Sequence, residues 1–363
     1  MLRKLLVRGA LILGTLLFAL VVLEVGLRLN GWGEKPSRYF DPDIGMRFHG
    51  NQTRDTFGKD GPPVSYSVNQ AGLRGPWYDG PKPPGVTRVI CLGDSFTFSW
   101  GAQDEEAWPW LLERMLEERL GPGRAQVANF GFPMLNTRAE LNAYHKLARD
   151  KDWDVMLLGW YLNDIERIAG GVRYTEHWIF QALSGLALME YFHYRIRPKI
   201  GWFDVVRSPE LLEAIALYQK HYAEIESDPD GELGRPFWER GMADLRDLVR
   251  EVRADGVKLA VIVFPSTTQV SPLHEALARS PADGEALIDG PLGAPQRRVL
   301  AVLQELDVPT IDLLRPLAES PEDPFGRYDH GHLGELGYRI TAEQALAGLI
   351  ELGWLPDGEG PGD

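Results

Sequence analysis

Cysteine is almost absent from this 363-residue chain, and the single residue Cys91 excludes an intrachain disulfide. With no CxxC pair and no Cys/His cluster, the sequence offers no cysteine-based metal site. Cys91 lies in an apolar run, where we expect a small buried packing residue. The composition is 44% hydrophobic and 25% charged, so the chain has the proportions of a globular protein that buries an ordinary core.

Positive charge is also scarce, because 38 Lys and Arg face 52 Asp and Glu and the net charge is −14. Nucleic-acid binders need a basic face, so the balance argues against a DNA or RNA partner. An anionic polymer stays open as a substrate, since local fields matter more than the total charge.

Only the amino terminus carries a long apolar run. Arg3, Lys4 and Arg8 precede residues 9–27, which are interrupted by Glu24 alone. About 20 apolar residues suffice to span a bilayer, and the basic flank predicts a cytoplasmic amino terminus with the rest of the chain outside. A cleaved signal peptide is the alternative, but no small-x-small cleavage site ends the run. We therefore predict a membrane anchor over 1–30, a single-pass cell-membrane protein with its catalytic domain extracytoplasmic, and secretion as the alternative.

The remaining chain divides by composition. Residues 31–86 are rich in Gly, Pro, Asp and Asn, which predicts an extended tether wrapping the surface. Residues 87–355 form the predicted domain, interrupted at about 165–234 by an aromatic-rich, largely helical insertion. That insertion is either a helical pair packed on the core or a lid. The tail 356–363 is expected to be disordered.

Within the domain, short apolar runs alternate with amphipathic helical stretches. The predicted strands are 87–93, 125–131, 154–160, 257–264 and 308–313. The predicted helices are 105–120, 136–150, 235–256 and 335–353. Nearly continuous apolar strands between helices indicate an α/β protein with a five-stranded, mainly parallel sheet covered on both faces.

Ligands of such sheets bind beyond the carboxyl ends of the strands, so the loops there hold the candidate residues. The first strand runs into "GDSFTFSWG" with Ser95, the second ends at Gly131 in "NFGFP", and the third precedes Asn163 in "YLNDI". Asp329 and His332 stand in "DHGH" just before the last helix.

Together these residues supply every part of an acyl-transfer site. Ser95 would attack, His332 would act as general base and then general acid, and Asp329 would orient the imidazole. The backbone N–H of Ser95, the backbone N–H of Gly131 and the side-chain amide of Asn163 would form the oxyanion hole.

Each assignment has a plainer alternative. Ser95 and Gly131 are also turn-forming residues, and Asp329 and Asn163 are also common helix caps. His330 is the second choice for the base. An HxH pair could bind a metal, but the sequence shows no motif that supplies the other ligands, so we expect no metal and no cofactor.

The four segments quoted above, "GDSFTFSWG", "NFGFP", "YLNDI" and "DHGH", resemble in this order the four sequence blocks of the SGNH/GDSL hydrolase family. "VNQAGLRGP" at 68–76 and the amino-terminal anchor are similar to a bacterial, membrane-anchored, extracytoplasmic subgroup. The resemblance implies a three-layer, flavodoxin-like α/β/α sandwich, cofactor-free esterase or acyl-transferring activity, and the same roles for the residues above. Two positions depart from the family pattern: Tyr161 and Met134 stand where glycine is usual.

We therefore predict a serine esterase acting on O-acyl esters, O-acetyl foremost, of a carbohydrate or cell-envelope substrate, including polysaccharide. An O-acyltransferase that acetylates an extracytoplasmic polysaccharide would use the same residues. A non-catalytic binding module would instead have lost one of them. Three further positions stay open: Asp94 is expected to shape the turn, Phe96 lies in the core or in a pocket wall, and Arg74 either anchors the tether through a carboxylate or faces solvent.

Overall fold

Five parallel strands form the centre of the computed structural model, which describes residues 2–30, 38–41, 43–56, 64–165, 186–191, 217, 220–326 and 331–356. The strands are β5 (Thr87–Gly93), β6 (Ala125–Gly131), β7 (Val155–Tyr161), β8 (Lys258–Phe264) and β9 (Thr310–Asp312), and their order is β6-β5-β7-β8-β9. All seven residues of β5 are buried, as expected for an apolar strand at the centre of a parallel sheet. The predicted sheet is confirmed.

This strand order fixes where a ligand binds. The second strand, β6, lies on one side of β5, and all later strands lie on the other side. The connections leaving β5 and β7 therefore diverge at their carboxyl ends, which opens the crevice that ligands of this topology occupy. Ser95 follows β5 and Asn163 follows β7, so both belong to this switch point.

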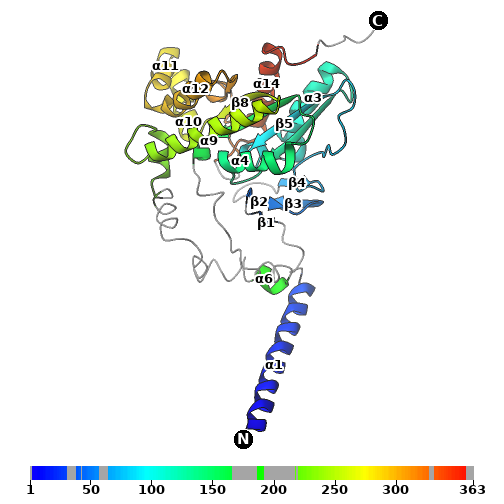
Figure 1. Cartoon of the computed structure of the whole chain (residues 1–363). Coiled ribbons are helices and arrows are strands. Elements are labelled where there is room, and N and C mark those ends of the chain that lie inside the picture. The colour runs from blue at the N-terminus through cyan, green and yellow to red at the C-terminus, as the bar shows by residue number, and fades with distance from the viewer. Residues whose placement is uncertain are drawn as a thin grey trace. The chain divides into compact units, whose positions relative to one another are not determined.

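Helices cover both faces of the sheet (Figure 1). Alternate strand residues such as Leu92 and Leu158 pack with α4 (Thr137–Ala143), α9 (Arg235–Ala254) and α12 (Ala294–Glu305). Their neighbours, such as Cys91 and Leu157, face a second core formed with α3 (Trp108–Leu120), α10 (Thr267–Arg279), α13 (Leu314–Ala318) and α14 (Glu335–Glu351). The domain is thus the three-layer α/β/α sandwich that the family resemblance implied.

Several helices differ from the sequence prediction. Residues 267–305 form α10, α11 (Pro281–Asp289) and α12, none of which was predicted. The predicted helix 136–150 is α4 followed by a π-helical turn, Tyr144–Ala148. The helix expected from residue 105 begins at Trp108, after a 3₁₀ turn at Asp104–Glu106, because Pro109 has no N–H to give and suits the first helical turn.

The segment expected to be an extended tether contains two small sheets. β1 (Arg38–Asp41) pairs with β2 (Gly45–Phe48), and β3 (Gln52–Thr56) pairs antiparallel with β4 (Val64–Val68). Phe48, Tyr66 and Val68 pack with Phe98, which follows the candidate nucleophile by three residues. The segment therefore shares a core with the active-site region.

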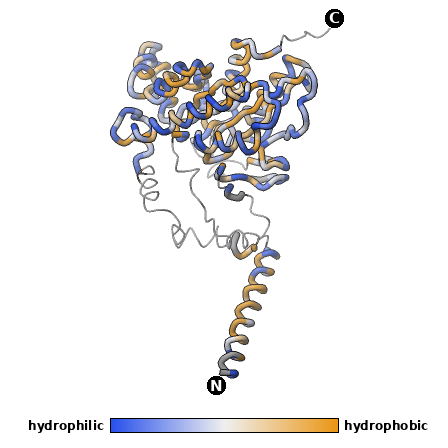
Figure 2. Tube along the Cα trace, in the orientation of Figure 1, coloured by the Kyte–Doolittle hydropathy of each residue, from blue (hydrophilic) through white to orange (hydrophobic). Residues whose placement is uncertain are grey.

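A second compact unit comprises residues 1–39 and 173–209, separate from the unit of 40–172 and 210–363. Its helix α1 (Leu2–Leu29) contains Val7–Leu29, with a mean hydropathy of 2.5 and no buried residues, and Figure 2 shows most of this helix as hydrophobic. By length and composition it can cross a membrane or act as a signal sequence. Glu24 pairs with Arg28 and accepts the N–H groups of Ala187 and Leu188 at the start of α6 (Ala187–Tyr191). Most of the predicted insertion, and the tail from residue 357, lie outside the described residues.

Candidate active site

Ser95 is the first residue of a four-residue helix, α2 (Ser95–Phe98), directly after β5. Asp94 caps this helix, because its carboxylate accepts the N–H of Phe96 at 2.8 Å. The turn that the sequence predicted for Gly-Asp-Ser is thus a strand-to-helix turn that presents Ser95 at the carboxyl edge of the sheet. Ser95 itself is partly exposed, while Asp94 is fully buried.

His332 lies against the nucleophile, with Nε2 2.8 Å from Ser95 Oγ. Backbone bonds fix the loop that carries it: the Gly326 N–H donates to the His332 carbonyl, and the Gly334 N–H donates to the Pro324 carbonyl. The imidazole also contacts the Phe96 ring, with 5.1 Å between ring centroids. A distance of 2.8 Å is within the range in which a base takes a proton directly.

Asp329 and His330, the two other candidate residues of the "DHGH" block, lie outside the described residues, so their predicted roles stay predictions. The nitrogen of His332 that faces Ser95 is Nε2. The position for an orienting carboxylate is therefore beside Nδ1, as in the Ser-His-Asp arrangement.

A row of three glycines forms the floor beneath α2. Gly93 and Gly131 end their strands, Gly159 lies two residues before the end of β7, and both Gly131 and Gly159 are paired in register with Gly93. A Cβ on Gly93 or Gly159 would lie 2.1 or 2.2 Å from Thr97 Oγ1, and one on Gly131 would lie 2.0 Å from the Phe98 backbone nitrogen. Side chains cannot approach so closely, so only glycine at these positions lets the nucleophile helix rest on the sheet.

The predicted oxyanion donors differ in how they are bonded. The Gly131 N–H donates to Asn129 Oδ1 at 2.9 Å in a buried setting, so it is already engaged. The Asn163 side chain hydrogen-bonds to Asp94, beside Ser95. An amide nitrogen carries two N–H bonds, so Asn163 can bond Asp94 and still offer a donor to a substrate oxygen.

The two departures from the family pattern have clear positions in the structure. Met134 adopts φ = 68°, the left-handed conformation that favours glycine, and its side chain is 54% exposed. Tyr161 ends β7, and its ring stacks on Phe96 with 4.2 Å between centroids. Phe96 thus joins Tyr161 and His332 in an aromatic cluster behind Ser95, which resolves the choice left open for Phe96 in favour of a buried ring at the site.

Three buried carboxyl groups interact electrostatically next to the nucleophile. Burial raises the pKa of Asp94 to about 6, although the Phe96 N–H, the charge on His332 and the Asn163 amide favour its ionised form. Burial and the Asp94 charge hold the pKa of Glu140 well above its usual range. The pKa of Asp164 is also well above its usual range, because of burial and the charges on Glu140 and Asp94. Both carboxyl oxygens of Glu140 lack a hydrogen-bond partner within the described part of the chain.

Glu140 is not among the site residues predicted from the sequence. A signal was present, because Glu140 stands three and four positions before Ala143 and Tyr144, both buried, on the apolar side of its helix. A carboxylate at such spacing indicates a buried acid.

The family model of the GDSL-like lipase/acylhydrolase family matches residues 91–340, more than half of the chain. The chain belongs to this family. It is an ester-hydrolysing enzyme by family, and the resemblance of the sequence to the SGNH/GDSL family is confirmed. The GDSL block that gives the family its name is the segment that begins α2 and carries Ser95.

The solved structures to which this chain is similar are distant in sequence. The lipase Lip_vut3 from a goat rumen metagenome is 13% identical, with a TM-score of 0.45, over 76% of this chain and 99% of that one. The lipase/acylhydrolase from Enterococcus faecalis is 13% identical with a TM-score of 0.42, over 76% and 100%. The acetyl xylan esterase AlAXEase is 13% identical with a TM-score of 0.43, over 72% and 100%. No curated protein sequence matches the chain.

Proposed function

We propose that this GDSL-family protein is a serine esterase in which Ser95 is the nucleophile and His332 the general base. The observation that carries the proposal is the 2.8 Å contact between Ser95 Oγ and His332 Nε2, which joins residues 237 positions apart in the chain. A serine hydroxyl is a weak nucleophile on its own and needs an adjacent base to take its proton.

The reaction proceeds in two steps. His332 takes the Ser95 proton as Oγ attacks the ester carbonyl, and then delivers that proton to the departing alkoxide. Water, activated by the same imidazole, cleaves the acyl-serine. The negative oxygen of each tetrahedral intermediate is stabilised by the Ser95 N–H and the Asn163 amide, both of which also interact with the Asp94 carboxylate. Gly131 contributes only if its N–H exchanges the Asn129 side chain for the substrate oxygen. Asp329 orients Nδ1 of His332.

We propose an O-acyl ester of a carbohydrate, O-acetyl foremost, as the substrate. Tyr161, partly exposed and stacked on Phe96, is the aromatic residue that we expect to pack against the C–H face of a sugar. Interception of the acyl-enzyme by a sugar hydroxyl instead of water would make the protein an acyltransferase. Product analysis with an added glycan acceptor separates the two outcomes.

We propose that α1 is an uncleaved anchor that holds the catalytic domain at the extracytoplasmic face of the cell membrane. Its apolar length and basic amino-terminal flank support this. An amino-terminal tag should stay on the protein in membranes washed with alkaline carbonate. Loss of the tag and release of a shortened protein would show a signal peptide instead.

Hydrolysis of p-nitrophenyl acetate tests the chemistry. We expect Ser95→Ala to lower kcat by about 10³-fold or more, because removal of a nucleophile leaves only binding and oxyanion stabilisation. Ser227→Ala, which changes an exposed serine in a helical segment, is the matched control and should retain wild-type kcat. Equal activity of the Ser95→Ala variant and the wild type would disprove the proposed mechanism.

A further inference from the structure

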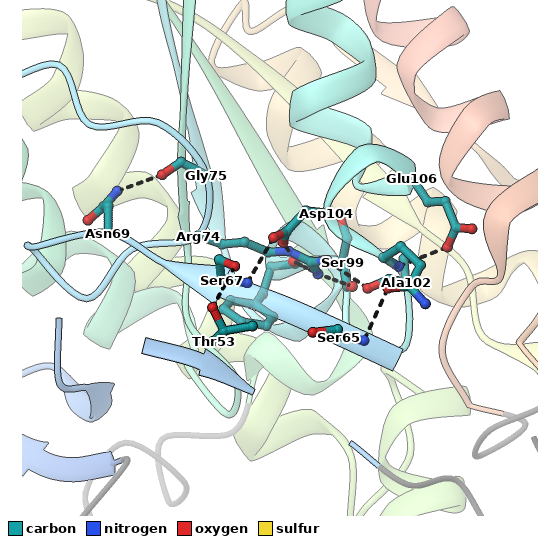
Figure 3. A network of polar contacts seen from close by, with 12 residues as sticks. Thr53, Ser65, Ser67, Asn69, Arg74, Gly75, Ser99, Ala102, Asp104 and Glu106 are labelled. Atoms are coloured by element: carbon teal, nitrogen blue, oxygen red, sulfur yellow. Dashed lines mark hydrogen bonds and ion pairs between the residues drawn. The ribbon is translucent and has the colours of Figure 1, made fainter. Parts of the chain in front are cut away.

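Arg74, the arginine of the "VNQAGLRGP" motif, is buried beneath the nucleophile segment, which we define as residues Ser95–Ala102. Its side chain is 2% exposed, although an arginine is seldom buried without extensive pairing. Nε donates to Asp104 Oδ1 at 3.0 Å, Nη1 donates to the carbonyls of Phe98 (2.9 Å) and Ser99 (2.6 Å), and Nη2 donates to the carbonyl of Ala102 (2.6 Å). Figure 3 shows these contacts around the guanidinium.

Three of the four acceptors are backbone carbonyls of one short stretch that starts at the nucleophile. Other groups hold the rest of that stretch: the Trp100 N–H bonds the Ser95 carbonyl, Trp108 Nε1 bonds the Phe96 carbonyl, and the Tyr338 hydroxyl bonds the Trp100 carbonyl. Ser99 bends the chain there with φ = 62°, a strained value for a residue other than glycine. Such a bend persists only where surrounding contacts enforce it. Arg74 bonds the carbonyls of Phe98 and Ser99, which are the peptide groups on either side of the Ser99 α-carbon.

The rest of the motif delivers Arg74 to this place. Asn69 Oδ1 accepts the N–H groups of Ala71 and Leu73, and Asn69 Nδ2 donates to the carbonyls of Gly75 and Pro76. Gly72 has φ = 75°, and a Cβ there would lie 2.2 Å from the Phe48 carbonyl oxygen. Asparagine and glycine thus build a tight turn whose exit residue is Arg74, while Phe98 and Tyr66 pack against the guanidinium at 5.3 and 5.6 Å.

We infer that Arg74 is a positioning residue of the esterase: it holds the carboxyl end of the nucleophile segment so that Ser95 Oγ stays within reach of His332. This inference rests on the proposed function of Ser95. It also assigns a role to the segment before the domain, which supplies part of the active-site scaffold. The planar guanidinium suits this task, because its fixed fork addresses several carbonyls at once, whereas a lysine ammonium is a single point of charge.

The test compares Arg74 with Arg88, a second buried arginine, which lies at the amino end of β5, whereas Ser95 follows the carboxyl end. Arg88 is 2% exposed and donates to Gln126 Oε1 at 2.8 Å and to the Gly80 carbonyl at 3.1 Å, far along the strand from Ser95. The variants are Arg74→Met, Arg74→Lys, Arg88→Met and Arg88→Lys in the full chain. Activity on p-nitrophenyl acetate is expressed per active serine, titrated with a fluorophosphonate, so that loss of folded protein does not count as loss of rate.

We expect Arg74→Met to lower kcat per active serine by about 10- to 100-fold with KM within about 3-fold, since small displacements of a catalytic group cost this much. Arg74→Lys should recover part of the loss. Both Arg88 variants should keep wild-type kcat per active serine even where they lower Tm. Equal kcat per active serine in the Arg74→Met and Arg88→Met variants would overturn the inference.

Amide hydrogen exchange separates this inference from the proposed function. Peptides covering 94–102 should exchange faster in Arg74→Met than in Arg88→Met. Faster exchange in Arg74→Met, in a protein that shows no Ser95-dependent activity, would refute the proposed esterase function but would support the contact between Arg74 and the nucleophile segment. Unchanged exchange at 94–102, with or without activity, would refute the positioning role.

Discussion

Asp94 and Glu140 are both buried carboxyl groups, but they differ in the hydrogen bonds that they accept. Asp94 is buried but receives the Phe96 N–H and the Asn163 amide, so its raised pKa stops at about 6. Glu140 is equally buried and has no such donors in the described part of the chain. We therefore expect Glu140 to be protonated at neutral pH and to limit stability at alkaline pH.

Glu140→Gln tests this expectation. The raised pKa means that the folded state binds the Glu140 proton more tightly than the unfolded state does. Wild-type stability therefore falls as pH rises from the unfolded pKa of about 4.5 towards the folded pKa. The variant lacks this titration. The free energy of unfolding of the variant should match the wild type at pH 4 and exceed it increasingly above pH 5, by at most about 1.4 kcal/mol per pH unit.

Denaturant unfolding at a series of pH values measures the difference. Glu118→Gln, on the exposed side of α3, is the control, because burial cannot act there. A Glu140→Gln difference that does not change with pH would contradict the assignment of a buried, protonated Glu140.

At the scale of elements, the position of α2 depends on how closely it lies on the sheet. The contacts that exclude a Cβ are of two kinds: Gly159 faces the Thr97 hydroxyl, whereas Gly131 faces the Phe98 backbone. A side-chain obstacle can be removed by a second substitution, but a backbone obstacle cannot.

Gly159→Ala should therefore lower kcat by about 10-fold or more through displacement of α2, and Thr97→Ala in the same chain should restore most of it. Gly131→Ala should lower kcat similarly, with no recovery from Thr97→Ala. Steady-state kinetics of the two single and two double variants decide the matter. Recovery of both glycine variants, or of neither, would show that the close approach of α2 is not what sets the rate.

For the whole molecule, the sequence predicts the strands of the sheet and the residues that meet at its carboxyl edge, because local patterns encode both. The strands β5 and β6 match their predicted bounds, because buried apolar runs end at glycines there. The pairing of Ser95 with His332 follows from the rule that strand ends share an edge.

What the sequence does not show is which side chains bond to which backbone groups, whether those groups are near or distant in the chain. The bond from Gly131 to Asn129 cannot be distinguished from a free N–H in a one-dimensional pattern. Arg74 stayed undecided between solvent and a carboxylate, because its three carbonyl acceptors have no sequence signature.

Helices α10 and α12 were not predicted from the sequence. Each has a proline, in the interior of α10 and near the start of α12, and proline interrupts a helical pattern.

The most direct test of Ser95 as nucleophile and His332 as its base is to measure where and how fast the acyl-enzyme forms. The full chain is quenched in acid milliseconds after mixing with p-nitrophenyl acetate, and the acetyl group is located by peptide mass spectrometry. We expect acetylation of Ser95 in the wild type, and we expect the acetyl-serine to form about 10²- to 10⁴-fold more slowly in His332→Ala. Acetylation at another residue, or an unchanged rate at Ser95 without His332, would contradict these roles of Ser95 and His332.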